Sequence, residues 1–197
     1  MFTFPEIKKI LTRKTVGIAG AGGLGSNCAI SLARVGIGKI ILADFDNVTV
    51  KNLNRQYFFR EQVGQKKVFA LKDNIFFIDA KINVEAHDIR LNSENLTTVF
   101  DGCDVLVEGF DCAEMKSMFV ETVITKMPWI PVILGLGIAG WGSNEAIRSW
   151  QTGNIYVCGD EQSETAENLP PLAPKVGIVA NMQANTALEI LLKSNGK

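Results

Sequence analysis

The fold of this 197-residue chain is decided by one stretch, Lys14-Thr-Val-Gly-Ile-Ala19-Gly20-Ala21-Gly22-Gly23-Leu24-Gly25-Ser26. The mainly apolar run over residues 14–19 predicts a buried strand, and the apolar spacing over residues 24–35 predicts a helix. The turn between them satisfies the GxGxxG pattern at Gly20, Gly22 and Gly25. Strand, glycine turn and helix in this order predict a nucleotide-binding βαβ unit.

Each glycine of the pattern has a physical role. Gly20 permits a tight turn, Gly22 and its neighbour Gly23 let phosphate oxygens approach the backbone, and Gly25 allows close packing of helix on strand. The helix N-terminus offers free N–H groups and a positive dipole end to an anion. Asp44 ends the second predicted strand, 19 residues after Gly25, where a carboxylate can accept hydrogen bonds from ribose. The simpler interpretation is a glycine turn that binds no ligand. If a ligand does bind, NAD is the default for such a pattern.

Outward from this stretch, apolar runs alternate with helical patterns. We expect strands over residues 14–19, 39–43, 82–86, 104–109 and 131–136, and helices over 24–35, 60–79 and 113–126. Apolar strands separated by helices indicate a parallel sheet that is covered on both faces.

The pattern changes after Gly137. Residues 146–150 and 154–158 are expected to form short antiparallel strands around a Thr152-Gly153 turn, residues 159–175 a loop, and residues 175–193 a helix. The expected fold is therefore a Rossmann-like, doubly wound α/β sheet, mainly parallel, with a short antiparallel extension and a C-terminal helix. We expect residues 1–197 to form a single domain.

Composition excludes several classes of protein. The hydrophobic content of 47% and the charged content of 21% are typical of a globular chain, and the net charge of −1 gives no general attraction to nucleic acid or an anionic membrane. We find no apolar run of about 20 residues and no signal peptide, and therefore expect a cytoplasmic protein without a membrane segment. The four cysteines form no CxxC pair, so we expect no zinc and free thiols.

Polar blocks follow the predicted strands and change the expected ligand. They are Asp44-Phe45-Asp46-Asn47-Val48, Asn52-Leu53-Asn54-Arg55-Gln56, Gly64-Gln65-Lys66-Lys67-Val68 and Glu108-Gly109-Phe110-Asp111. Ligands of open α/β sheets bind at the carboxyl ends of the strands, where these blocks emerge. Arg55 and Lys67 can neutralise phosphoryl oxygens and Asp111 can hold Mg²⁺, which suits a triphosphate better than a dinucleotide.

In the same order, these blocks resemble the ThiF/MoeB/HesA superfamily, which includes the adenylating domains of ubiquitin-activating enzymes. The resemblance covers roughly residues 15–135 and implies ATP-dependent adenylation of the C-terminal Gly-Gly carboxylate of a small ubiquitin-fold sulfur carrier, with release of pyrophosphate. It implies that Asp44 binds ribose, that Arg55 and Lys67 contact phosphates, and that Asp111 ligates Mg²⁺. Asn52 and Gln56 are further expected contacts.

The later block Tyr156-Val157-Cys158-Gly159-Asp160-Glu161 resembles a short bacterial ThiF branch associated with thiamine biosynthesis. This resemblance implies a ThiS-like carrier as partner, a separate sulfur donor and a homodimer. Many relatives have an N-terminal arm whose arginine reaches the ATP of the neighbouring subunit, and Arg13 lies too close to the first strand to match it. Some relatives also use a late cysteine to bond the carrier, and the context of Cys158 does not identify it with that residue.

Several alternatives stay open. Lys66 competes with Lys67 as the phosphate ligand, and Asp111 could cap the following helix instead of, or besides, binding metal. Asp46 is expected to stabilise a turn, and Cys103 and Cys112 are expected to be small apolar fillers. The rival functions are an NAD-dependent oxidoreductase, a non-catalytic scaffold like the inactive halves of ubiquitin-type activators, and an enzyme acting on a modified tRNA base.

Overall fold

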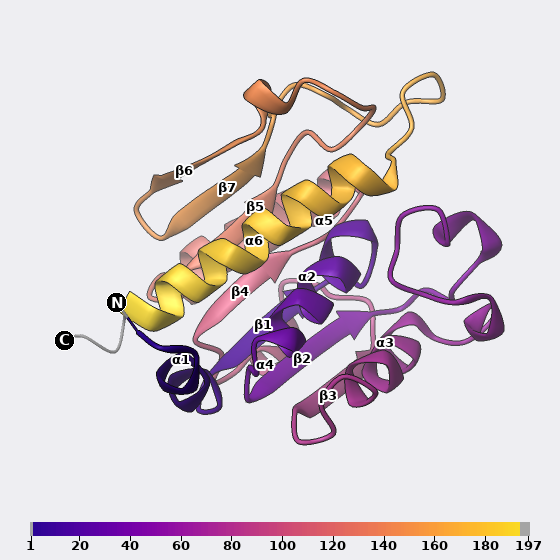
Figure 1. The fold of residues 1–197 in the computed structure, drawn as a ribbon. Helices are drawn as coiled ribbons and strands as arrows, with labels where there is room; N and C mark the ends of the chain where they lie inside the picture. The colour runs from indigo at the N-terminus through magenta and orange to yellow at the C-terminus, as the bar shows by residue number, and fades with distance from the viewer. Residues whose placement is uncertain (1, 194–197) are drawn as a thin grey trace.

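The computed structural model describes residues 2–193, which form a seven-stranded sheet with helices on both faces (Figure 1). The strands are β1 (Thr15–Ala19), β2 (Lys39–Asp44), β3 (Asn83–Asp88), β4 (Val105–Glu108), β5 (Val132–Gly135), β6 (Arg148–Thr152) and β7 (Ile155–Gly159). Their order is β3-β2-β1-β4-β5-β7-β6, and only β6 and β7 pair antiparallel. The predicted Rossmann-like fold with a short antiparallel extension is confirmed.

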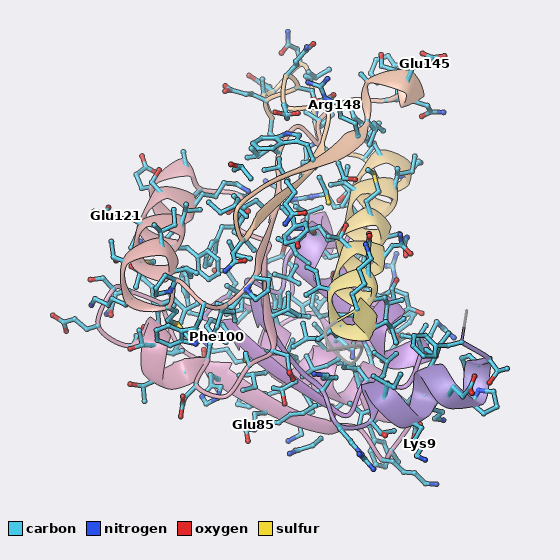
Figure 2. All side chains as sticks on the ribbon, turned by 90° about the vertical axis from the view of Figure 1, so that its left-hand side faces the viewer. Lys9, Glu85, Phe100, Glu121, Glu145 and Arg148 are labelled. Atoms are coloured by element: carbon cyan, nitrogen blue, oxygen red, sulfur yellow. The ribbon has the colours of Figure 1, made fainter. Side chains whose placement is uncertain are left out.

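Helices cover the two faces unequally. They are α1 (Phe4–Leu11), α2 (Gly23–Arg34), α3 (Lys67–Phe76), α4 (Leu96–Val99), α5 (Ala113–Lys126) and α6 (Ala173–Lys193). Helices α2, α3 and α6 pack on one face, α4 and α5 on the other, and Figure 2 shows α5 and α6 on opposite sides of the sheet. Within residues 2–193, no helix has both the length and the apolar character needed to cross a membrane.

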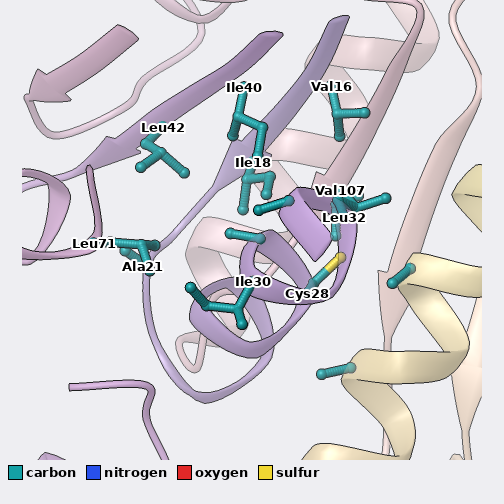
Figure 3. Packing of buried hydrophobic residues seen from close by; sticks show 14 of the residues in the cluster. Val16, Ile18, Ala21, Cys28, Ile30, Leu32, Ile40, Leu42, Leu71 and Val107 are labelled. Carbon is teal, nitrogen blue, oxygen red and sulfur yellow. The ribbon is translucent and has the colours of Figure 1, made fainter. Parts of the chain in front are cut away.

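The larger core lies between the first strands and α2. Ile18 on β1 and Leu42 on β2 are fully buried against this helix, where Leu32 is also fully buried (Figure 3). On the other face, Phe100 and Phe119 anchor a second core, and both are fully buried. Burial on both faces explains why β1, β2, β4 and β5 are nearly continuous apolar runs rather than alternating ones.

The helix expected over residues 60–79 is wrong at both ends. A 3-10 turn (Arg60–Gln62) comes first, Gly64 adopts a left-handed φ of +94°, and α3 begins only at Lys67. Residues 63–64 form a turn, and Lys66 makes an antiparallel bridge with Asn47 in the segment that follows β2. The backbone N–H of Lys67 then donates to the Asp46 carbonyl at 3.0 Å. This long-range contact overrides the local helical pattern.

The antiparallel pair is shifted by one to two residues from its predicted position. Residues 144–146 form a 3-10 turn, and the hairpin turns at Gly153-Asn154 with Gly153 at a φ of +54°, rather than at Thr152-Gly153. Helix α6 begins at Ala173, two residues before the predicted start, because proline is tolerated in a first helical turn. Helices α1 and α4 were not predicted, and both pack an apolar side chain, Leu11 and Leu96, into the cores.

Candidate functional site

A cavity lies at the carboxyl ends of β1, β2 and β4. The strand order reverses between β1 and β4, and open α/β sheets bind ligands at such a point. Its walls contain eight residues expected from the sequence: Gly20, Gly22, Gly23, Asp44, Arg55, Gln56, Lys67 and Asp111. The structure therefore brings together segments that are up to 91 residues apart in the chain.

The glycine loop is built by close backbone contacts. Gly20 has a left-handed φ of +94°, and a Cβ atom there would lie 2.9 Å from the carbonyl oxygen of Gly109 after β4. Gly25 does not line the cavity. A Cβ atom at Gly25 would lie 1.8 Å from the Gly20 carbonyl oxygen, so this glycine lets α2 approach the turn, as the pattern predicts.

The Asp44 carboxylate is fixed in place at the end of β2. Its two oxygens accept hydrogen bonds from the backbone N–H groups of Ala21 and Asp46, both at 2.7 Å. Burial raises the pKa of Asp44 above its usual range, whereas the Lys67 ammonium and these two N–H donors act in the opposite direction. One acceptor lone pair per oxygen is still free to meet a hydroxyl at the cavity wall.

Lys67 and Lys66 point to different places. The Lys67 side chain lines the cavity and is only 7% exposed, and its Nζ lies 2.7 Å from Asp46 Oδ2. The Lys66 Nζ instead donates to the Phe45 carbonyl oxygen at 2.9 Å and pairs with Asp88 at 3.0 Å. Among the described cavity residues Lys67 is thus the lysine available to a bound anion, and Asp46 is its ion-pair partner.

Arg55 and Gln56 flank the start of α2. The Arg55 side chain passes over Gly23, and its Nη1 donates to the Asn54 side chain at 2.9 Å. Gln56 is 8% exposed, and its buried Oε1 has no hydrogen-bond partner within residues 2–193. Asn52, by contrast, is not on the cavity wall, because its Oδ1 accepts from the Thr49 N–H at 2.9 Å and caps a 3-10 turn.

Asp111 stands on the turn between β4 and α5. The helix N-cap is Cys112, and Asp111 is exposed without a hydrogen-bond donor in the described chain, so the alternative in which Asp111 caps this helix is not observed. Buried Glu108 holds this turn, because it accepts from the Phe110 N–H at 2.6 Å and pairs with Lys116 at 2.8 Å. Burial raises the pKa of Glu108, which the Lys116 charge opposes.

The Asp111 carboxylate accepts no hydrogen bond in the described chain, and such a group suits a magnesium ion that is held mainly by a substrate. Magnesium usually takes one or two carboxylates, several waters and substrate phosphates rather than a full protein cage. In the part of the chain that the structure describes, no group of three or more His, Cys, Asp or Glu side chains could hold a metal alone. Asp111 therefore fits Mg²⁺ only together with phosphate oxygens.

The cysteines differ from the expectation in one case. Cys103 is buried, as expected of a filler, but Cys112 is half-buried on the cavity wall and its Sγ lies 2.8 Å from Glu114 Oε2. Cys158 is fully buried, with its Sγ 3.7 Å from Thr186 Oγ1. Burial raises the pKa of Cys158, so this thiol is neither accessible nor readily ionised, as a nucleophile must be.

Other cavity residues were missed by sequence reasoning. Ile89, Arg90 and Leu91 follow β3, and the Arg90 guanidinium lies 5.3 Å from the centre of the Phe45 ring. The rule that polar blocks follow strands could have found Arg90, because β3 ends at Asp88 beside β2. Thr165 and Pro171 come from the distant loop before α6, and we see no local signal that would have placed them here.

A family model described as the ThiF family matches residues 2–197. The chain belongs to the ThiF family. It is 38% identical over 177 residues to ubiquitin-like modifier-activating enzyme 5 of Caenorhabditis elegans, covering 85% of this chain and 40% of that protein. It is 27% identical to the molybdopterin-synthase adenylyltransferase of Salmonella typhimurium, covering 94% of this chain and 76% of that protein.

Solved structures agree with this fold. The tRNA N6-threonylcarbamoyladenosine dehydratase of E. coli, determined in complex with AMP, superposes with a TM-score of 0.87 and 19% identity, covering 97% of this chain and 91% of that one. At this identity the similarity concerns the fold alone. The chain spans less than half the length of several eukaryotic relatives that it matches.

Proposed function

We propose that this ThiF-family chain is an ATP-dependent adenylyltransferase that activates the C-terminal Gly-Gly carboxylate of a ThiS-like, ubiquitin-fold sulfur carrier. The observation that carries the proposal is the meeting of Arg55, Lys67 and Asp111 beside the glycine loop. A nicotinamide dinucleotide needs no such set, whereas a triphosphate needs cations and a metal ligand. Relatives named as adenylyltransferases, and a structural neighbour that holds AMP, support it.

The chemistry requires positioning more than proton transfer. An α-carboxyl group has a pKa of about 3.5, so the carrier tail is already anionic at pH 7. In the proposed step a carboxylate oxygen attacks the α-phosphorus, a P–O–C bond forms, and the bond to the leaving pyrophosphate breaks. Arg55 and Lys67 offset the charge of the two anions, Asp44 orients the ribose, and Asp111 would hold Mg²⁺, which supplies further charge neutralisation.

The wider setting is also part of the proposal. We place the whole chain, residues 1–197, in one adenylating domain that acts in the cytoplasm in thiamine biosynthesis, with a separate sulfur donor. The loop at residues 160–172, which contributes Thr165 and Pro171 to the cavity wall, is proposed to cover the entering carrier tail.

The proposed assembly is a homodimer. The expected particle mass is twice the 21.5 kDa of the chain, measured by sedimentation equilibrium at micromolar concentration. A mass equal to one chain over the whole concentration range would contradict it.

The decisive experiment for the proposed function is ATP–pyrophosphate exchange with and without a ThiS-like carrier that ends in Gly-Gly. We expect exchange to depend on the carrier and to fall by at least about 100-fold in Arg55→Ala and Asp111→Ala. The first substitution removes a positive charge at the phosphates, and the second removes the proposed Mg²⁺ ligand. Arg13→Ala and Asp101→Ala, both exposed and outside the cavity, are the matched controls and should keep wild-type exchange.

Two outcomes would contradict the proposal. Robust exchange in Arg55→Ala and Asp111→Ala would exclude the assigned site. Binding of NADH without binding of ATP would favour the oxidoreductase instead.

A further inference from the structure

A buried ion pair joins the two ends of the loop at residues 160–172. Asp160 directly follows β7, and Lys175 lies in the first turn of α6. The Lys175 Nζ lies 2.6 Å from Asp160 Oδ2, and the two side chains are only 6% and 7% exposed. Neither residue lines the cavity, and the proposed chemistry does not use them.

The pair is the centre of a cluster of polar contacts, in which the Lys175 ammonium and both Asp160 oxygens have hydrogen-bond partners. Lys175 also donates to the Ala139 carbonyl oxygen at 2.8 Å and to Ser163 Oγ at 3.2 Å. The other Asp160 oxygen accepts from the N–H groups of Gln162 and Ser163, both at 2.9 Å, and from Ser163 Oγ at 3.0 Å. One ammonium thus ties α6 to the chain after β5 and to the chain after β7.

The backbone is shaped around this carboxylate. Gly137 has a φ of +73°, and a Cβ atom there would lie 1.9 Å from Asp160 Oδ1. Gly159 has a φ of +135°, and a Cβ atom there would lie 1.7 Å from the Leu136 carbonyl oxygen. Any side chain at either position would push the loop away, so the two glycines and the ion pair specify one path for the chain.

The segments tied together here form part of the cavity wall. Ile138 comes from the chain after β5, and Thr165 and Pro171 come from the loop. Most of residues 161–168 are exposed, so few apolar contacts hold this stretch. The position of such a segment depends strongly on its few buried polar anchors.

We propose that Lys175 and Asp160 are positioning residues that hold residues 160–172 over the cavity and thereby set the affinity for the carrier tail. This inference rests on the proposed function. A buried ion pair is often no more stabilising than apolar side chains of the same volume, so stability alone is a weak reason for its presence. Apolar side chains in place of Lys175 and Asp160 would not fix the path of the loop, because the N–H groups of Gln162 and Ser163 would lose their acceptor.

The charge state agrees with this role. Burial acts to raise the pKa of Asp160, but the hydrogen bonds from Lys175, Ser163 and Gln162 outweigh it and hold that pKa below its usual range. The Asp160 carboxylate therefore stays ionised at neutral pH, and its hydrogen bonds from Lys175, Ser163 and Gln162 remain formed.

The test compares three variants of the full chain. Lys175→Met leaves Asp160 buried without its partner, and the double variant Lys175→Met/Asp160→Leu removes both charges. The matched control is Arg148→Met, which breaks the ion pair between Arg148 on β6 (labelled in Figure 2) and Glu161 of the same loop. The Arg148 side chain is 69% exposed. Five quantities are measured: the amide hydrogen exchange of residues 161–171, the melting temperature, the carrier KM, kcat and the ATP Kd.

We expect Lys175→Met to melt at a lower temperature and the double variant to melt near the wild type. In both, residues 161–171 should exchange at least about tenfold faster and the carrier KM should rise by about tenfold or more, while kcat and the ATP Kd change by less than about twofold. Arg148→Met should match the wild type in every quantity.

Recovery of both melting temperature and KM in the double variant would overturn the proposal, because the pair would then act through stability alone. Faster amide exchange with an unchanged KM, or unchanged amide exchange in the double variant, would overturn it as well. If Lys175→Met does not fold, the double variant alone decides between these results. If the wild type shows no carrier-dependent ATP–pyrophosphate exchange, the proposed function fails. The amide hydrogen exchange of residues 161–171 still decides whether the ion pair anchors the loop.

Discussion

At the scale of single residues, two neighbouring lysines near the glycine loop direct their charged groups to different places. Lys66 and Lys67 are neighbours in the chain, yet Lys66 binds the Phe45 carbonyl and Asp88, whereas Lys67 reaches the cavity. The reason is that α3 begins at Lys67, so its side chain follows the helix while Lys66 still belongs to extended chain. Only one of the two cations can then stabilise a charge in the cavity.

The two lysines form a matched pair of test sites. We expect Lys67→Met to lower carrier-dependent ATP–pyrophosphate exchange by at least about 100-fold, because a buried cation at the phosphates is lost. Lys66→Met should change the rate by less than about threefold, since an ion pair this exposed contributes at most about 1 kcal/mol. The measurement is the exchange rate at saturating ATP. Equal loss in both variants would contradict the assignment of Lys67.

At the scale of elements, two glycines in α2 and α6 show how closely each helix approaches its neighbours. Gly25 faces the Gly20 carbonyl oxygen, and a Cβ atom there would lie only 1.8 Å away. Gly177 in α6 has nothing within 4 Å of the position of a Cβ atom. Helix α2 therefore cannot carry a side chain at its contact with the turn, whereas α6 can at Gly177.

The same alanine substitution should act in opposite directions at these positions. Gly25→Ala is expected to lower the free energy of unfolding by at least about 2 kcal/mol, because backbone atoms must shift. Gly177→Ala should raise it by about 0.5–1 kcal/mol, because alanine is the better helix former. Urea unfolding followed by circular dichroism measures both. Destabilisation by Gly177→Ala would show that α6 is more crowded there than the structure indicates.

At the scale of the whole molecule, the two cores leave one thiol within reach of solvent. Cys28 and Cys158 are fully buried between the sheet and its helices, and Cys103 is 8% exposed in the other core. Burial raises the pKa of Cys103 to about 12, so this thiol is also poorly ionised at neutral pH. Cys112 alone of the four lies on the wall of the cavity.

Alkylation tests this distribution. In the folded protein, N-ethylmaleimide should modify Cys112 and leave the other three thiols unreacted, because reaction requires an accessible thiolate. Mass spectrometry should find one adduct per chain before unfolding and four after it. ATP should slow the reaction if the nucleotide occupies the cavity as proposed. Rapid modification of Cys158 would contradict the packing of α6 on β7.

The sequence by itself determined the succession of the main strands and helices, the glycine loop and eight of the residues on the cavity wall. β1, β2, β4 and β5 could be predicted because they are buried on both faces and are therefore nearly continuous apolar runs. Gly20, Gly22, Asp44 and Arg55 could be placed at one site because the carboxyl ends of parallel strands share one edge of the sheet.

Only the tertiary structure decided the rest, because the deciding contacts join residues that are distant in the chain. The helix expected from residue 60 begins only at Lys67, whose N–H donates to the Asp46 carbonyl. The Asn52 side chain accepts from the Thr49 N–H and does not reach the cavity. The position of residues 160–172 over the site depends on Lys175 reaching Asp160 and Ala139. Hydrophobic periodicity carries no information about such polar contacts, since it reports only which face of an element is buried.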